Sequence, residues 1–90
     1  LGFCKKGEGG PFVADGKLRV GGELPTNTDG GGLSACHPGM RGMFLLVEAT
    51  KQLRGEFAGS PRQVPDAEVA CVSATGGWFS ATSTVILGKN

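Results

Sequence analysis

The strongest periodic pattern of the chain lies in its middle. The polar residues Arg41, Glu48 and Gln52 fall on one narrow stripe at about 100° per residue, the spacing of an α-helix. Apolar side chains occupy most of the remaining circumference, namely those of Met43, Leu45, Leu46, Val47, Ala49 and Leu53. The pattern predicts a helix that begins within residues 38–40, where a proline suits the first turn, and ends at Gly55, which suits a left-handed cap.

A helix with so little polar surface is normally buried on nearly every side. The chain has 90 residues and 17 of them are glycine, which leaves few side chains to cover such a helix. We therefore expect something beyond these residues to cover it, either further polypeptide or a partner subunit.

Two segments after the helix have the composition of β-strands. Residues 68–74 alternate weakly between polar and apolar side chains, and residues 79–87 are rich in Thr, Ser, Val and Ile, which favour strands. The Thr-Gly-Gly sequence at residues 75–77 lies between them and predicts the turn of an antiparallel pair.

The first part of the chain predicts short strands as well. Ala14-Asp15-Gly16 separates Phe12-Val13 from residues 17–20, and an Asp-Gly pair between two such segments predicts a small β-hairpin. Residues 1–22 are therefore predicted to form a loop and hairpin segment, and residues 23–90 the core. The fold class predicted from the residues is α/β, with one mostly buried helix, an antiparallel strand pair after it and short N-terminal strands.

Composition excludes several classes of protein. The net charge of +1 gives no electrostatic basis for binding nucleic acid or an anionic membrane, and no apolar run approaches the about 18 residues of a transmembrane span. The chain lacks an initiator Met and the layout of a signal peptide, so we expect a fragment or a processed chain.

The three cysteines are too few and too irregularly spaced for a disulfide framework, and no CxxC pair indicates a metal site. We expect reduced thiols, a cytoplasmic protein and no metal. Cys36 and Cys71 are predicted to be small buried residues.

His37 is the only histidine, and it lies between a glycine-rich loop and the predicted helix. A neutral imidazole there has two interpretations: it activates a nucleophile or donates to a developing oxyanion, or it merely caps the helix. The glycine runs Gly30-Gly31-Gly32 and Gly76-Gly77 likewise fit either anion-binding backbone turns or simple tight turns. Three arginines have two interpretations, contacts with phosphate groups or solvated surface charges, and the second is favoured; they are Arg41, Arg54 and Arg62.

The order of motifs around His37 is specific. Asn-x-x-Gly-Gly is followed by His-Pro-Gly and then by the apolar helix, with Asn27, Gly30, Gly31, His37, Pro38 and Gly39 as the motif residues. Further matching segments are GELP at 22–25, QLRGE at 52–56, VPDA at 64–67 and TGG at 75–77. Together they resemble the C-terminal region of the thiolase superfamily, in particular its acetyl-CoA acetyltransferases and its lipid-transfer, sterol-carrier-like branch.

The resemblance implies the end of the second of two similar α/β halves, so a nucleophile-bearing N-terminal half would be missing. It implies that His37 takes part in catalysis on an acyl-CoA thioester and that Gly76 and Gly77 supply backbone groups to an oxyanion hole. Coenzyme A would be the substrate carrier, with no cofactor bound covalently. The full enzyme would be a homo-oligomer, with a zinc-ribbon/OB-fold protein as a further partner in some relatives.

Two positions depart from the family pattern. Ala74 stands where the resemblance places an acid/base cysteine, and Cys36 replaces the glycine before the histidine. Three hypotheses therefore remain open: a fragment of an acyl-transferring or thiolytic enzyme that is inactive alone, a retro-aldol lyase acting on sterol side-chain CoA thioesters, and a non-catalytic lipid-binding or interaction module.

Overall fold

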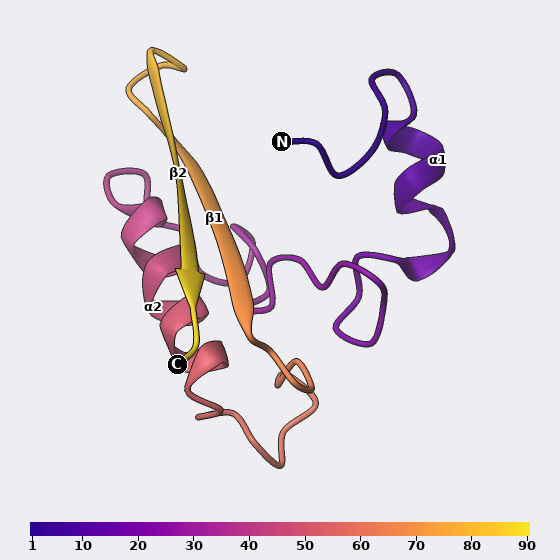
Figure 1. Ribbon diagram of the computed structural model, residues 1–90. Helices are drawn as coiled ribbons and strands as arrows, with labels where there is room; N and C mark the ends of the chain where they lie inside the picture. Colours follow the sequence, from indigo (N-terminus) through magenta and orange to yellow (C-terminus); the bar gives the residue numbers. More distant parts are fainter.

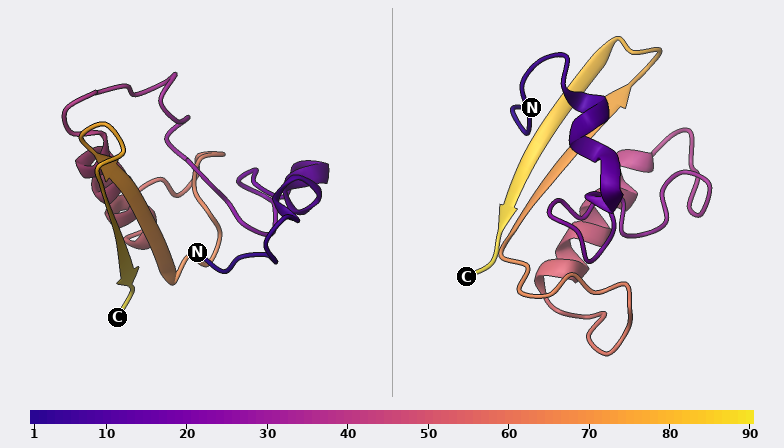
Figure 2. Two further views of the ribbon diagram at one scale, coloured as in Figure 1. Left: turned by 90° about the horizontal axis from the view of Figure 1, so that it is seen from above. Right: turned by 90° about the vertical axis from the view of Figure 1, so that its right-hand side faces the viewer.

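The computed structural model describes residues 1–90 and contains one helix packed along a β-hairpin. The elements in chain order are α1 (Gly9–Val13), the 3₁₀ turn η1 (Ala14–Gly16), α2 (Arg41–Leu53), β1 (Val69–Gly76) and β2 (Ala81–Gly88). Figure 1 shows α2 alongside β1 and β2, whereas α1 stands apart from them. The view from above in Figure 2 shows the same separation. The predicted helix and antiparallel pair are thus confirmed.

Helix α2 ends as its glycine predicts. Gly55 has a φ of +70°, and its N–H donates to the carbonyl of Gln52 at 3.1 Å. The N–H of Glu56 donates to the carbonyl of Lys51 at 3.0 Å. These two bonds form a Schellman motif, which satisfies carbonyl groups that the last turn of a helix leaves free.

The hairpin turns one face toward α2. In its register Val69 lies opposite Gly88 and Gly76 opposite Ala81. Val72 is buried, and its neighbours on the same face are half-buried. Cys71 points to the other face and is exposed, so the prediction of a buried residue there is wrong. Alternation along a strand puts it opposite the face that α2 covers.

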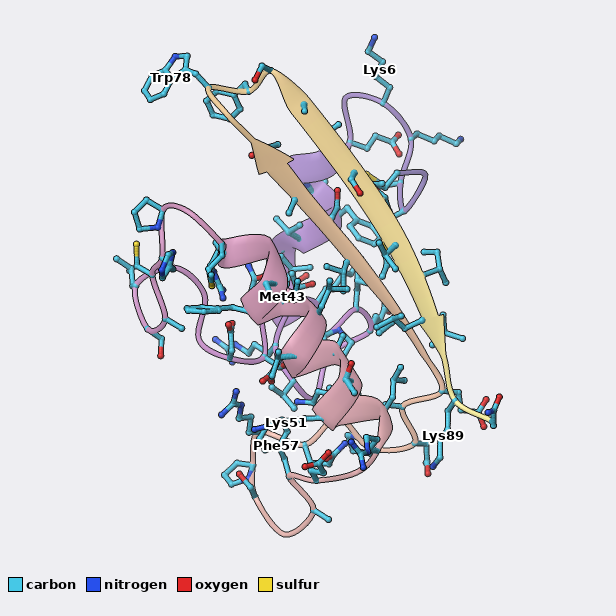
Figure 3. All side chains as sticks on the ribbon, turned by 90° about the vertical axis from the view of Figure 1, so that its left-hand side faces the viewer. Lys6, Met43, Lys51, Phe57, Trp78 and Lys89 are labelled. Carbon is cyan, nitrogen blue, oxygen red and sulfur yellow. The ribbon has the colours of Figure 1, made fainter.

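Helix and hairpin approach each other closely at Gly42. A Cβ atom on Gly42 would lie only 3.0 Å from the Cβ of Ala74, so glycine allows this contact. The turn of the hairpin comprises residues 77–80, slightly later than predicted, and Trp78 is 92% exposed. Figure 3 shows Trp78 at the tip, away from the helix.

The prediction of short N-terminal strands around Asp15-Gly16 is wrong, because this part of the chain contains no strand. Both residues have positive φ, but they are the last two residues of the 3₁₀ turn η1, which directly follows α1, so no strand precedes them. The N–H of Leu24 instead donates to the carbonyl of Lys17 at 2.9 Å, so residues 17–20, the predicted second arm, bond to residues that follow them. Arms of two to four residues bury too little to hold a hairpin by themselves.

The core within these residues is small. Only 5 of the 90 residues are buried, and the radius of gyration is 13.6 Å, against about 12 Å for a compact domain of this length. Met43 and Val47 on α2 are exposed (Met43 is labelled in Figure 3), so part of the apolar helix surface has no cover within the chain. No helix combines the length and the hydropathy needed to cross a membrane.

Candidate functional site

His37 closes the turn that leads into α2. Its Nδ1 atom accepts hydrogen bonds from the backbone N–H groups of Gly39 at 3.1 Å and Met40 at 3.0 Å. Its ring meets Phe44 edge-on, with 5.5 Å between the centroids. Because the lone pair of Nδ1 is occupied, the neutral ring carries its hydrogen on Nε2. Both bonded amides precede Arg41, the first residue of α2, so His37 closes the turn before the helix and does not cap a helical amide. This role is compatible with an Nε2–H donor that faces outward.

The glycine-rich loop before His37 is a tight turn. The N–H of Gly30 donates to the carbonyl of Asn27 at 2.9 Å, and the N–H of Gly31 donates to Oδ1 of Asp29 at 2.9 Å. Asn27, Gly30 and Gly31 all have positive φ. The amide of Gly31 is thus used inside the loop, which supports the tight-turn interpretation of this glycine run.

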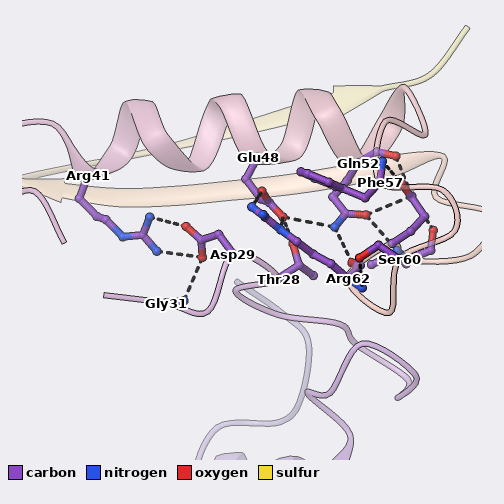
Figure 4. A network of polar contacts seen from close by, with 11 residues as sticks. Thr28, Asp29, Gly31, Arg41, Glu48, Gln52, Phe57, Ser60 and Arg62 are labelled. Atoms are coloured by element: carbon purple, nitrogen blue, oxygen red, sulfur yellow. Dashed lines mark hydrogen bonds and ion pairs between the residues drawn. The ribbon is translucent and has the colours of Figure 1, made fainter. Parts of the chain in front are cut away.

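Asp29 also binds the first residue of α2. Arg41 donates from both terminal nitrogens to the Asp29 carboxylate, at 2.5 and 3.1 Å (Figure 4). The Asp29 side chain is only 7% exposed. The bonds from Arg41 and from Gly31 outweigh burial and lower the pKa of Asp29, while the pKa of Arg41 is raised by the same pairing. The prediction that Arg41 is a solvated surface charge is wrong.

Glu48 is the centre of a second polar cluster, on the same face of α2 as Arg41 and two turns further along. It accepts hydrogen bonds from Thr28 at 2.7 Å, from Gln52 at 3.2 Å and from the guanidinium of Arg62, with Arg62 Nε at 3.1 Å (Figure 4). Burial by itself would raise the pKa of Glu48, but the bonds from Arg62, Thr28 and Gln52 together lower it. Arg62 is therefore an ion-pair partner and not only a solvated charge, while Arg54 is exposed as predicted.

Gln52 extends this cluster to the loop after the helix. Its Nε2 donates to the carbonyl of Arg62 at 2.8 Å, and its Oε1 accepts from the N–H of Val64 at 2.9 Å. Gln63 donates to the same Oε1 at 3.1 Å. Sequence reasoning missed this cluster, although Glu48 and Gln52, four residues apart on an apolar helix, were a signal for a buried polar contact.

A groove of about 410 Å³ lies where the His-Pro-Gly turn meets the end of β1. It is lined by residues 38–42 and Leu45 on one side and by residues 73–77 on the other. The structure thus brings Pro38 and Gly39 to the same groove as Gly76 and Gly77. The His37 ring, Asn27, Gly30 and Gly31 are not part of this lining.

The cysteines do not contribute to this groove. All three are free and exposed, so the prediction that Cys36 is buried is wrong. Cys36 lies in the loop before His37, where no element packs over it. The hydrogen bonds of His37 go to backbone amides, and no thiol takes part in them.

Comparison with known proteins assigns the class. Residues 1–89 match the thiolase C-terminal domain-like family, and the chain belongs to this family. A 17-hydroxy-3-oxo-4-pregnene-20-carboxyl-CoA lyase of Mycobacterium tuberculosis is 44% identical over 88 residues, 98% of this chain and 21% of the relative. The expected resemblance to the thiolase superfamily is thereby confirmed.

Two further relatives have similar identities. A steroid side-chain-cleaving aldolase of Thermomonospora curvata is 41% identical over 90 residues, 100% of this chain and 21% of the relative. An acetyl-CoA acetyltransferase of Methanothermobacter thermautotrophicus is 45% identical over 90 residues, 99% of this chain and 23% of the relative. The chain therefore spans about one fifth of the length of these curated relatives.

Proposed function

We propose that residues 1–90 form one wall of an active site that acts on acyl-CoA thioesters, with His37 as the residue that contacts the reacting thioester. The observation that carries the proposal is the hydrogen bonding of His37. Nδ1 is held by the amides of Gly39 and Met40, which leaves Nε2–H as a donor on an exposed ring. Family membership and the CoA thioester chemistry named for the relatives support the same assignment.

In this proposal His37 stabilises negative charge on the thioester oxygen. A preorganised N–H donor is most effective where charge develops in the transition state, and removal of one such donor costs about 100- to 1,000-fold in kcat. Backbone groups of Gly76 and Gly77, which line the neighbouring groove, would add further donors. Coenzyme A would enter as part of the substrate and would not be a resident cofactor.

For the reaction class, Ala74 favours carbon–carbon bond cleavage by a retro-aldol reaction. Ala74 lines the groove between Ser73 and Thr75, and its methyl group cannot transfer a proton. In a retro-aldol step a base takes the proton of the β-hydroxyl group, the oxygen forms a carbonyl group at the β carbon, and the bond between the α and β carbons breaks, so the β carbon leaves in a ketone or aldehyde. The electron pair moves onto the thioester as an enolate, and a proton at the α carbon then gives the shortened thioester. His37 would donate to the enolate oxygen, and residues beyond these 90 would supply the base.

Acyl transfer or thiolysis is the second candidate. It is favoured by the acetyl-CoA acetyltransferase, which is as similar to this chain as the two carbon–carbon bond-cleaving relatives. That reaction needs a nucleophile opposite His37, and the hydrogen bonds of the ring include none. Under either candidate we expect the 90 residues alone to be inactive, because further polypeptide must complete the site.

The test is a chimera in which these 90 residues replace the matching fifth of the Thermomonospora curvata aldolase. Retro-aldol cleavage of a steroid side-chain CoA thioester should be retained, and thiolysis of an acyl-CoA should be absent. His37→Asn should lower kcat about 100- to 1,000-fold. Asn separates the two roles of His37, because its side-chain oxygen can accept hydrogen bonds from the amides of Gly39 and Met40 and keep the turn closed while the Nε2–H donor is lost.

His37→Ala is the companion variant, because it removes both the turn contact and the donor. If His37→Asn kept full kcat while the chimera was active, His37 would have a structural role only and the proposal would fail. Thiolysis without retro-aldol cleavage would favour the second candidate instead.

A further inference from the structure

Helix α2 begins without the usual N-terminal features. Its first turn contains no acidic residue, and the side chain of Met40 makes no capping hydrogen bond. Its first residue is Arg41, a cation at the positive end of the helix dipole, which is unfavourable. A compensating negative charge must come from outside the helix.

Asp29 supplies that charge, and it also connects the glycine-rich loop to the start of α2. One carboxylate binds both terminal nitrogens of Arg41 and the amide of Gly31. It therefore ties the glycine-rich loop to the first residue of α2. The His37 turn lies on the segment between these two anchor points, and its last amide, that of Met40, is adjacent to Arg41.

We propose that the Asp29–Arg41 pair positions the catalytic turn: it holds the amides of Gly39 and Met40 on Nδ1 of His37 and so keeps the hydrogen on Nε2. Its importance for catalysis rests on the proposed function, whereas its effect on the His37 ring does not. Asp29 and Arg41 are then positioning residues that act through the backbone of the turn.

The Glu48 cluster offers an internal comparison. It also attaches the loop to α2, through Thr28, but its anchor on the helix lies two helical turns beyond Arg41 and is not adjacent to the His37 turn. A loss of general stability would follow from damage to either cluster. Only damage to the Asp29–Arg41 pair should change the state of the His37 ring.

The experiment uses nuclear magnetic resonance of the 90-residue chain with ¹⁵N-labelled histidine. His37 is the only histidine, so its two ring nitrogens need no further assignment. At about pH 9, where imidazole is neutral, the wild type should show Nε2 protonated and Nδ1 unprotonated. Asp29→Asn keeps an oxygen for the Gly31 amide but removes the charge that binds Arg41. It should lower the excess of the Nε2–H form about fivefold, the equivalent of one hydrogen bond of about 1 kcal/mol.

Glu48→Gln is the matched control, since it also removes a carboxylate from an arginine pair. It should leave both nitrogen resonances of His37 unchanged. Arg41→Lys is a second test, because lysine keeps the charge but cannot bind a carboxylate through a planar fork. It should move the resonances in the direction of Asp29→Asn, by a smaller amount.

The proposal is overturned if Asp29→Asn leaves the His37 resonances unchanged, or if Glu48→Gln moves them as far. If Asp29→Asn prevents folding, the Arg41→Lys result decides alone. None of these readouts depends on activity. A lower excess of the Nε2–H form in Asp29→Asn would support the positioning role even if the His37→Asn chimera stayed active and the proposed function failed.

Discussion

On one face of α2 two polar side chains are buried, and on another face two apolar side chains are exposed, the reverse of the usual distribution. Glu48 and Gln52 are polar but only 8% and 6% exposed. Met43 and Val47 are apolar but 56% and 48% exposed. The two polar side chains have all their hydrogen-bond partners within these 90 residues, whereas no residues fully cover Met43 and Val47.

The difference lies in what each face needs. A buried polar group needs a few partners in the right geometry, and Thr28, Arg62 and Gln63 come from two short loops. An apolar face needs area, and a chain with 17 glycines has few large side chains left to provide it. Short loops can thus satisfy a charge, but only another layer of polypeptide can cover an apolar stripe.

The largest effect should come from the small apolar core that does exist. Leu53 is buried on the same face of α2 as Gly42, which approaches Ala74 of the hairpin, and Leu53→Ala should lower the free energy of unfolding by about 2–4 kcal/mol. Urea unfolding of the chain measures this. A loss below about 0.5 kcal/mol would mean that the helix does not depend on the hairpin.

Glu48→Gln should have the next largest effect, about 1–2 kcal/mol, because Arg62 then lacks a charged partner. The estimate is modest because the Arg62 side chain is partly exposed. Glu56→Gln removes the exposed pair with Arg54 and is the matched control, expected to be near neutral. Equal losses for the two variants would show that burial adds nothing to the Glu48 pair.

Acid should weaken the polar face specifically. The pKa values of Asp29 and Glu48 are lower in the folded chain than their ordinary values of 3.8 and 4.5. Their contribution to stability is fully present above these values and is lost as the pH falls through the lowered values, so stability should decline below about pH 5. Urea unfolding at a series of pH values tests this, and Glu48→Gln should show a shallower decline. A stability that rises on acidification would contradict the ion-pair description.

The smallest effect should come from the exposed apolar face. Val47→Lys should change the stability of the chain by less than about 0.5 kcal/mol, because Val47 has no cover to lose. A loss comparable to that of Leu53→Ala would show that this face is covered in solution, for example by a second copy. In that case sedimentation of the wild-type chain and of Val47→Lys would show self-association of the wild type that the variant has lost.

Local patterns were sufficient for much of the fold. The spacing of Arg41, Glu48 and Gln52 indicated the helix, Gly55 its end, and the β-branched residues after it the antiparallel pair. These features depend on short-range chemistry, namely helix periodicity, a left-handed glycine and strand propensity. The prediction of an N-terminal hairpin was wrong because two short segments around Asp15-Gly16 bury too little to pair with each other.

The candidate site divides in the same way. The sequence by itself singled out His37 and its motif neighbours, and it placed Pro38, Gly39, Gly76 and Gly77 in one site by resemblance. Only the tertiary structure revealed that Asp29 binds Arg41 and that Arg62 binds Glu48. Those pairs join residues 12 and 14 positions apart, so they exist only after the loops fold back on α2. Periodicity reports which residues share a face, but the partner that covers the face is decided by long-range packing.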